Sequence, residues 1–103
     1  MEDTKTIRGF AFTGFKDFYG EDCSLQKSSL ATEDCIWLGI QDANPQVMAS
    51  LAPALGVNTN ETTGWVAYPI PADVSLNTRM HLCRDQVAEL LPYLQRFVET
   101  GEI

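Results

Sequence analysis

The sequence predicts an α+β fold: an antiparallel meander of about four strands, packed by a C-terminal helix and carrying a partly helical insertion. Four short segments alternate apolar and polar residues, which is the pattern of half-buried strands. A C-terminal segment instead repeats apolar residues at helical spacing, as amphipathic helices do. Between these regions, residues 43–78 hold four of the five prolines and neither Lys nor Arg. We interpret this stretch as an insertion within a single domain spanning residues 1–103.

The strands are expected at residues 6–13, 23–28, 35–40 and 79–82. In the first of them, Phe10 and Phe12 share one face. Gly14 then interrupts the alternation, because Phe15 has the opposite parity, and a glycine at such a point suits a bulge or a bend. The links between the first three strands are short, which predicts that neighbours in sequence pair as antiparallel hairpins.

The insertion contains weaker signals. Asn44 and Pro45 have the sequence of a helix start, with Asn as the cap and Pro at the first helical position. Gly56 can end that helix, because glycine readily adopts the left-handed conformation found there. Residues 65–70 are expected as an edge strand, since Pro69 cannot donate a ladder hydrogen bond.

The C-terminal helix is predicted to begin after Cys83 and to stop at Gly101. Pro92 removes one backbone donor and should bend it. The apolar stripe nevertheless continues through the proline and comprises Val87, Leu90, Leu91, Leu94, Phe97 and Val98. We expect this stripe to pack across the inward face of the sheet, which is formed by Phe10, Phe12, Leu25, Ile36, Leu38, Met80 and Leu82.

The opposite face of the predicted sheet carries Thr13, Ser24, Gln26, Ser28, Trp37, Gly39, Arg79 and His81. An indole beside hydroxyls, an amide and a cation suits recognition better than simple solvation, and Gly39 permits close approach of a ligand or another chain. Three interpretations stay open. The insertion covers Trp37 through Trp65 and Tyr68, the face is a dimer interface, or the face binds a ligand or partner.

The candidate ligand-binding residues come from this face, from the link after its second strand, and from the polar loop that leads into residues 65–70. They are Gln26, Ser28, Ser29, Trp37, Thr63, Trp65, Tyr68, Arg79 and His81. Lys27, Ser28 and Ser29 could hold a phosphate, but no glycine-rich loop precedes a helix here, so the sequence has no P-loop.

The charge balance disfavours several classes of function. The chain has 103 residues, with 7 Lys and Arg against 14 Asp and Glu, and a formal net charge of −7. General nucleic-acid binding needs a basic surface that displaces counterions, so it is not expected. No apolar run approaches the roughly 18 residues of a membrane span, and no signal peptide is visible. We therefore expect a cytoplasmic protein that binds no membrane.

Metal, cofactor and catalytic motifs are not found. The three cysteines, Cys23, Cys35 and Cys83, are odd in number and lack zinc-ligand spacing, so reduced thiols and no metal are expected. The single histidine, His81, has no marked nucleophile as partner. The paired acids at 21–22 and 33–34 fall in turns, where carboxylates keep ordinary pKa values. We expect no cofactor and no enzyme, with hydrolysis as the minority interpretation.

Several segments resemble a family of small uncharacterised bacteriophage proteins. The likeness covers most of the chain outside residues 43–78 and is carried by RGF at 8–10, YGEDCSLQKSS at 19–29, IWLG at 36–39, MHL at 80–82 and LQRFVETG at 94–101. The resemblance implies an accessory protein that acts in the cytoplasm of the bacterial host. It also implies counter-defence, by sequestering an immune nucleotide signal or by blocking a nuclease or CRISPR complex.

The function expected from these observations is sequestration of a nucleotide-derived immune signalling molecule without catalysis. The alternative is an acidic protein inhibitor of a host defence complex, similar to anti-CRISPR proteins. A salt-sensitive association with a basic protein would mark that alternative. The small core and the exposed aromatic face favour a homo-oligomer.

Overall fold

The computed structural model describes residues 1–6 and 9–103. The chain divides into two compact units, one formed by Met1–Gln41 with Thr78–Ile103 and the other by Asp42–Asn77. The boundaries of the second unit lie one residue from the stretch 43–78 that its composition sets apart. We call the two parts the sheet unit and the inserted unit, and each is described by itself.

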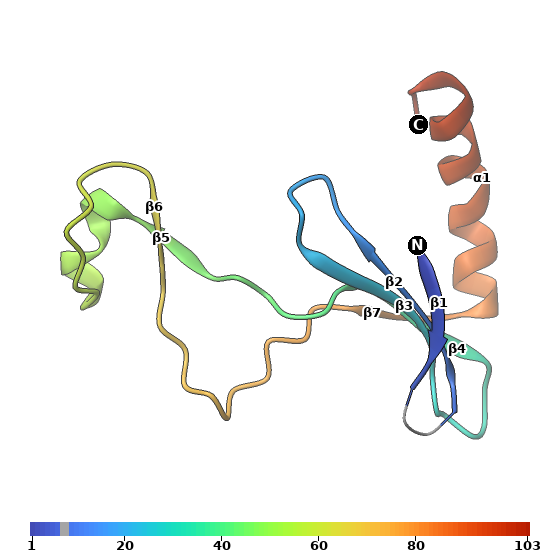
Figure 1. The fold of residues 1–103 in the computed structure, drawn as a ribbon. Helices are drawn as coiled ribbons and strands as arrows, with labels where there is room; N and C mark the ends of the chain where they lie inside the picture. The colour runs from blue at the N-terminus through green and yellow to red at the C-terminus, as the bar shows by residue number, and fades with distance from the viewer. Residues whose placement is uncertain (7–8) are drawn as a thin grey trace. The chain divides into compact units, whose positions relative to one another are not determined.

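The sheet unit contains five antiparallel strands in the spatial order β1-β2-β3-β4-β7 (Figure 1). Their bounds are Glu2–Lys5 for β1, Ala11–Lys16 for β2, Asp22–Lys27 for β3, Cys35–Ile40 for β4 and Met80–Cys83 for β7. With the C-terminal helix, this sheet confirms the α+β class. The first four strands form a meander, and β7 returns beside β4 after the inserted unit.

The N-terminal edge differs from the expectation. The strand predicted at 6–13 begins only at Ala11, and residues 7 and 8 of that prediction lie outside the described part of the chain. A further strand, β1, precedes it and pairs Lys5 with Ala11. Its sequence, EDTK, has no apolar residue, so periodicity alone gives no signal for it. An exposed edge strand made of charged and polar residues is also a poor template for unwanted pairing.

The register of β2 corrects the predicted faces of the sheet. Phe12 lies opposite Gln26, and Thr13 lies opposite Leu25. Because paired residues share a face, Phe12 belongs with Trp37, whereas Thr13 belongs with the aliphatic side chains. The pairing runs through Gly14 without a break, so the predicted bulge is wrong.

Gly39, which the sequence suggested could admit a ligand or another chain, admits the close approach of a neighbouring strand. Its φ is +142°, and a Cβ built on it would lie 3.2 Å from the Cα atom of Arg79. The close approach is therefore that of the neighbouring strand β7 within the same chain. Only glycine combines this backbone conformation with the absence of a side chain.

The C-terminal helix α1 spans Arg84–Thr100, with Pro92 inside it. The side chain of Gln86 accepts a hydrogen bond from the Cys83 N–H group at 2.9 Å, and together with the contact of the Cys83 side chain to the Gln86 backbone it forms the predicted capping box. Gly101 ends the helix with φ +76° and donates its N–H to the Phe97 carbonyl. The predicted bounds of the helix are therefore confirmed.

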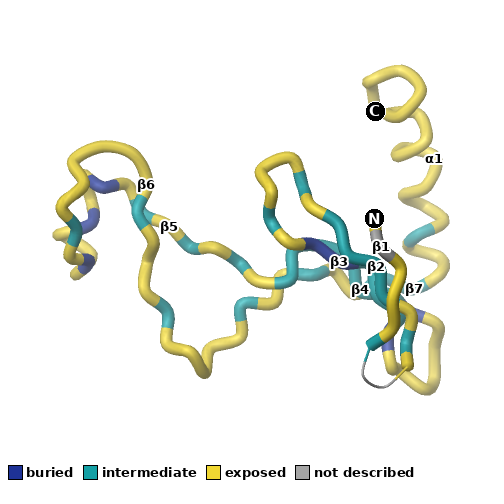
Figure 2. Tube along the Cα trace, viewed as in Figure 1, coloured by how far each residue is buried: buried dark blue, intermediate teal, exposed yellow. Residues whose placement is uncertain are grey.

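The position of α1 is not the predicted one. The helix leaves the end of β7 and contains no buried residue, and Figure 2 shows it exposed along most of its length. The apolar stripe residues Leu90, Leu91, Leu94, Phe97 and Val98 are 40–78% exposed. Among the described hydrophobic side chains of the sheet unit, only Cys23 and Cys35 are buried. The prediction that the stripe packs across the sheet is therefore wrong for the single chain.

The inserted unit is built around a two-stranded antiparallel ladder of β5, Gln46–Met48, and β6, Trp65–Ala67. Two 3₁₀ turns follow β5, at Ala49–Leu51 and Pro53–Leu55. Its buried apolar residues are Ala49, Ala52 and Val57, so the core is very small. This stretch is compact without a long helix.

Asn44 and Pro45 do not start a helix. The Pro45 carbonyl accepts a hydrogen bond from the Tyr68 N–H group at 3.0 Å, which extends the ladder where the helix was expected. Gly56 does end the second 3₁₀ turn in a left-handed conformation, as its sequence position predicted. Pairing with a distant segment overrides the local helix-start signal.

Candidate functional site

One row of side chains crosses four strands on the face of the sheet that carries Trp37. The register pairs Phe12 with Gln26, Gln26 with Trp37, and Trp37 with His81. Because residues opposite one another in an antiparallel pair lie on the same face, this row is a direct product of the strand pairing. We call it, together with Ser24, Ser28 and Arg79, the Trp37 face.

The centre of the Trp37 face is an aromatic stack. The rings of Trp37 and His81 lie 4.0 Å apart between centroids, with planes inclined by only 15°. The guanidinium carbon of Arg79 lies 5.7 Å from the centroid of the Trp37 ring, within the range of a cation–π contact. His81 is exposed and lies on the edge strand β7, so the stack is open to solvent at that edge.

A polar network holds the Arg79 side chain beside this stack. Arg79 Nη1 donates to Gln26 Oε1 at 2.7 Å and to Ser24 Oγ at 3.3 Å. Ser24 is completely buried, and a buried hydroxyl in the sheet is stable only with a hydrogen-bond partner. The guanidinium group therefore provides the buried Ser24 hydroxyl with a hydrogen-bond partner. It also places its positive charge on the Trp37 face.

Ser28 and His81 form the second polar contact of the face. Ser28 Oγ and His81 Nε2 share a hydrogen bond of 3.0 Å, which is the distance expected of a nucleophile and its base. However, Ser28 is only 5% exposed, and its Oγ also accepts the Leu30 N–H group at 3.2 Å. The hydroxyl is thus used to hold the turn after β3 and to position the imidazole ring.

The structure brings together five of the nine candidate ligand-binding residues. They are Gln26, Ser28, Trp37, Arg79 and His81. Ser29 is exposed in the link after β3. Thr63, Trp65 and Tyr68 belong to the inserted unit, where Trp65 is 64% exposed. The alternation of residues in the sequence placed Phe12 on the opposite face of the sheet. Phe12 belongs to the row on the Trp37 face because of the register of β2.

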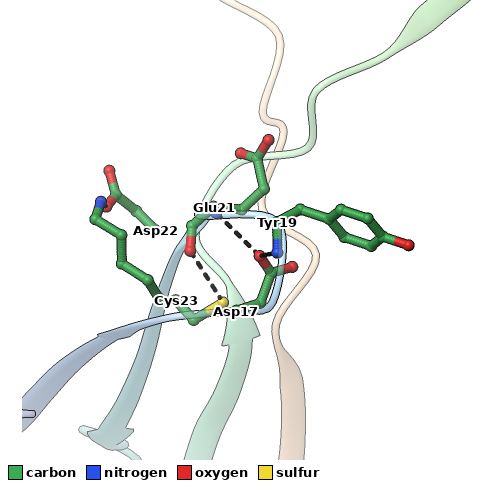
Figure 3. Close-up of polar contacts among 6 residues, drawn as sticks. Asp17, Tyr19, Glu21, Asp22 and Cys23 are labelled. Carbon is green, nitrogen blue, oxygen red and sulfur yellow. Dashed lines mark hydrogen bonds and ion pairs between the residues drawn. The ribbon is translucent and has the colours of Figure 1, made fainter.

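A second feature is the tip of the β2–β3 hairpin (Figure 3), whose aromatic residues are not among the candidate residues taken from the sequence. Asp17 Oδ1 accepts the N–H groups of Tyr19 and Glu21 at 2.9 and 3.0 Å, and Gly20 takes a positive φ of 86°. This turn presents Phe18 and Tyr19 at 96% and 87% exposure. The two rings contact each other edge to face at 5.6 Å.

Acidic side chains surround that aromatic pair. Asp17, Glu21 and Asp22 lie in or beside the turn, and Asp22 pairs with Lys16. The hydrogen bond and charge of Asp22 raise the pKa of Lys16 above its ordinary value. The signal available in the sequence was the pair of aromatic residues in a turn otherwise made of Asp, Gly and Glu.

A third cluster lies at the junction of β3, β4 and α1. Lys27 Nζ contacts Asp34 Oδ1 at 3.1 Å, and Arg84 lies 4.0 Å from the other carboxylate oxygen. The hydrogen bond from Lys27 holds the pKa of Asp34 below its ordinary value. Burial raises the pKa of the neighbouring Cys35 thiol, so this cysteine stays protonated and is a poor nucleophile.

Within residues 1–6 and 9–103, no three His, Cys, Asp or Glu side chains are grouped as a metal ion would require. Over the same residues, none of the helices has the length and apolar character needed to cross a membrane. Comparison with protein-family models, curated proteins and solved structures finds no match to this chain.

Proposed function

We propose that this protein is a non-enzymatic binding protein that sequesters a nucleotide-derived signalling molecule on its Trp37 face. The observation that supports this is the stack of Trp37 and His81 beside the guanidinium group of Arg79. A nucleotide combines a planar base with an anionic phosphate. The face offers a planar aromatic stack and a fixed cation within about the length of one nucleotide.

The proposed binding mode follows from the order of the strands. A base continues the stack at the exposed imidazole of His81, on the open edge of β7. Stacking of this kind is worth about 1–3 kcal/mol per base. The phosphate approaches Arg79, whose side chain is already held by Gln26 and Ser24. A preorganised guanidinium loses little conformational entropy when it binds an anion.

Binding without catalysis is proposed because of the position of Ser28. Its hydroxyl is buried and also accepts a backbone N–H group, whereas a nucleophile must reach the substrate. The imidazole of His81 is similarly engaged by Ser28 and by the Trp37 ring. The Ser28 hydroxyl and the His81 imidazole are thus both used in contacts that hold the Trp37 face together.

The biological setting is proposed from the resemblance to small bacteriophage proteins. A phage accessory protein in the host cytoplasm would act against defence systems that signal through cyclic dinucleotides or NAD-derived molecules. Sequestration suits a small protein, because binding alone lowers the free concentration of a signal when the protein is in excess over it.

Isothermal titration calorimetry with cyclic dinucleotides and NAD-derived signals tests this proposal. Trp37→Leu and Arg79→Gln should each abolish the heat of binding, because they remove the stack and the cation. Tyr93→Leu is the matched control, since Tyr93 is an exposed aromatic residue on α1. Trp65→Leu shows whether the inserted unit contributes.

Two results would contradict the proposal. One is the absence of heat from every ligand at high micromolar protein. The other is unchanged binding by the Trp37→Leu variant. Mass spectrometry of the recovered ligand addresses catalysis: an unchanged mass supports sequestration, and a hydrolysed product supports the minority hydrolase interpretation.

A second candidate function is inhibition of a defence protein through the hairpin tip. The turn formed by Asp17 keeps the side chains of Phe18 and Tyr19 exposed to solvent, and acidic residues surround them. Exposed aromatic anchors are typical centres of protein interfaces, and the acids would complement a basic rim. The partner would therefore be a basic protein with an apolar pocket.

Pull-down from bacterial lysate at low and high salt tests this second function. A partner that is lost at high salt, and also lost with the Phe18→Ala/Tyr19→Ala double variant, would support it. Leu51→Ala/Leu55→Ala serves as the control, because these two side chains are also exposed and lie in the inserted unit. Retention of the partner by the hairpin variant would exclude the tip as the docking site.

A further inference from the structure

The single chain leaves the apolar stripe of α1 without a packing partner. Leu90, Leu91, Leu94, Phe97 and Val98 are 40–78% exposed along consecutive turns of one helix face. A soluble monomer seldom exposes such a continuous apolar patch. A helix with one apolar face derives most of its stability from packing that face against another element.

The total exposed area of the chain is also high for its length. The chain exposes 8293 Å². The size scaling of folded proteins gives roughly 6,900 Å² for a chain of this length even when its two units are counted as separate bodies. The excess over this value is more than 1,000 Å², and it includes exposed residues of the inserted unit as well as those of α1.

A groove lies at the other end of the same stripe. It has a volume of about 560 Å³ and is lined on one side by Ile36 and Leu82 of the sheet and on the other by Val87 and Leu91 of α1. Lys27 and Asp34 lie at its rim. The helix therefore carries an apolar hollow near its start and a row of protruding apolar side chains near its end.

We propose that a second copy of this chain occupies the groove, in a symmetric dimer in which two α1 helices pack antiparallel. Phe97 and Val98 of each copy would enter the groove of the other. A two-fold axis forms this contact twice, because the same surface of each copy carries both the groove and the protruding Phe97 and Val98 side chains.

Within one chain, the geometry of the helix prevents Val98 from reaching the groove at Val87. Val98 lies eleven residues after Val87 on a continuous helix, which separates them by about 16 Å. A rigid helix cannot bring its own end back to its beginning, although the identical end of a second helix can reach it. Antiparallel pairing that sets Val87 opposite Val98 also sets Leu91 opposite Leu94.

The exposed area of the stripe fits a second copy of this chain. The five exposed stripe residues offer on the order of 100 Å² each, so two copies would bury about 1,000 Å² through them alone, near the lower limit of specific interfaces. The first turn of α1 carries both Arg84 and Asp85, so the start of the helix has no net charge from these two side chains. Antiparallel packing aligns the two helix dipoles favourably.

The dimer is independent of the proposed ligand site. Ile36 and Leu82 pair with each other in the register and lie on the aliphatic face, whereas Trp37 and His81 lie on the opposite face of the same strands. Ligand binding and self-association therefore use different surfaces, and failure of one proposal does not decide the other.

Light scattering coupled to size-exclusion chromatography tests the dimer. At roughly 100 µM protein, the wild-type chain should have twice the mass of one chain. Val98→Asp should be monomeric, because it places a carboxylate in the apolar contact. The substitution removes no core packing, since Val98 is 78% exposed. Arg96→Gln is the matched control, because it changes the net charge by the same amount two residues away and lies outside the stripe.

The expected results are a dimeric wild type, a monomeric Val98→Asp variant with unchanged helical circular dichroism, and a dimeric Arg96→Gln variant. A monomeric wild type would overturn the proposal. A dimeric Val98→Asp variant would also overturn it, because the interface would then lie elsewhere. Loss of the dimer in both variants would mean that charge, and not the stripe, controls association.

Discussion

Replacement of Gly39 by Ala is the sharpest test of how strand pairing builds the Trp37 face. Gly39 has φ +142°, and an added Cβ would meet the Arg79 Cα atom at 3.2 Å and the Thr78 carbonyl oxygen at 3.6 Å. Both atoms belong to backbone, which cannot rotate away as a flexible side chain can. The strained conformation alone costs about 1–3 kcal/mol for a residue other than glycine.

The control for this substitution is Gly20→Ala. Gly20 also has a positive φ, +86°, but its added Cβ would meet nothing within 4 Å. Its cost is the left-handed backbone alone, about 1–2 kcal/mol, offset by up to about 1 kcal/mol because alanine restricts the unfolded chain. We therefore expect Gly39→Ala to lower the free energy of unfolding by about 2–3 kcal/mol, and Gly20→Ala by about 1 kcal/mol or less.

Urea unfolding at fixed protein concentration measures the difference. In a Trp65→Phe background, the fluorescence of Trp37 reports the sheet unit alone, because the chain has only two tryptophans. With a slope of about 1 kcal/mol per molar urea, the midpoint of Gly39→Ala should fall about 1–2 M below that of Gly20→Ala. Equal midpoints for the two variants would refute the steric argument, and β7 would then not be held against Gly39.

Three further predictions concern the sheet unit. Asp17→Ala removes the acceptor of two backbone N–H groups in the hairpin turn, so unfolding free energy should fall by about 1 kcal/mol, measured by urea titration; an unchanged midpoint would contradict this. Asp34 has a lowered folded pKa because of Lys27, so its stabilising contribution is present above the ordinary Asp pKa and is lost as pH falls through the folded value. Asp34→Asn should therefore flatten the acid limb of the stability–pH curve measured by urea titration, and an unchanged acid limb would contradict this. A double-mutant cycle between Trp37 and His81 should give a coupling of about 0.5–1.5 kcal/mol, and a coupling near zero would mean that the stacked geometry is not energetically significant.

Much of the secondary structure of the sheet unit could be predicted from local pattern. Strands β3 and β4 and the helix α1 lie within one residue of their predicted bounds, since alternation and helical spacing are properties of consecutive residues. Five candidate residues also came together, because cross-strand neighbours follow once the meander is assumed. Strand β1 was missed because EDTK has no apolar period.

The faces of the sheet depended on register, which local pattern does not determine. A shift of one residue moves every side chain to the other face, and for this reason Phe12 and Thr13 exchanged places. The same limit applies to Asn44 and Pro45, whose helix-start signal gave way to pairing between β5 and β6. In both places, contacts with distant residues outweighed local preference.

The sequence by itself determined that this chain is an acidic α+β protein with an amphipathic C-terminal helix and an indole among polar groups on a sheet. The tertiary structure decided which side chains meet: Trp37 with His81, Arg79 with Gln26, and Gly39 with the backbone of β7. It also decided that the stripe of α1 does not cover the sheet. The physical reason is that periodicity shows which face of an element is apolar, whereas only the path of the whole chain determines what that face contacts.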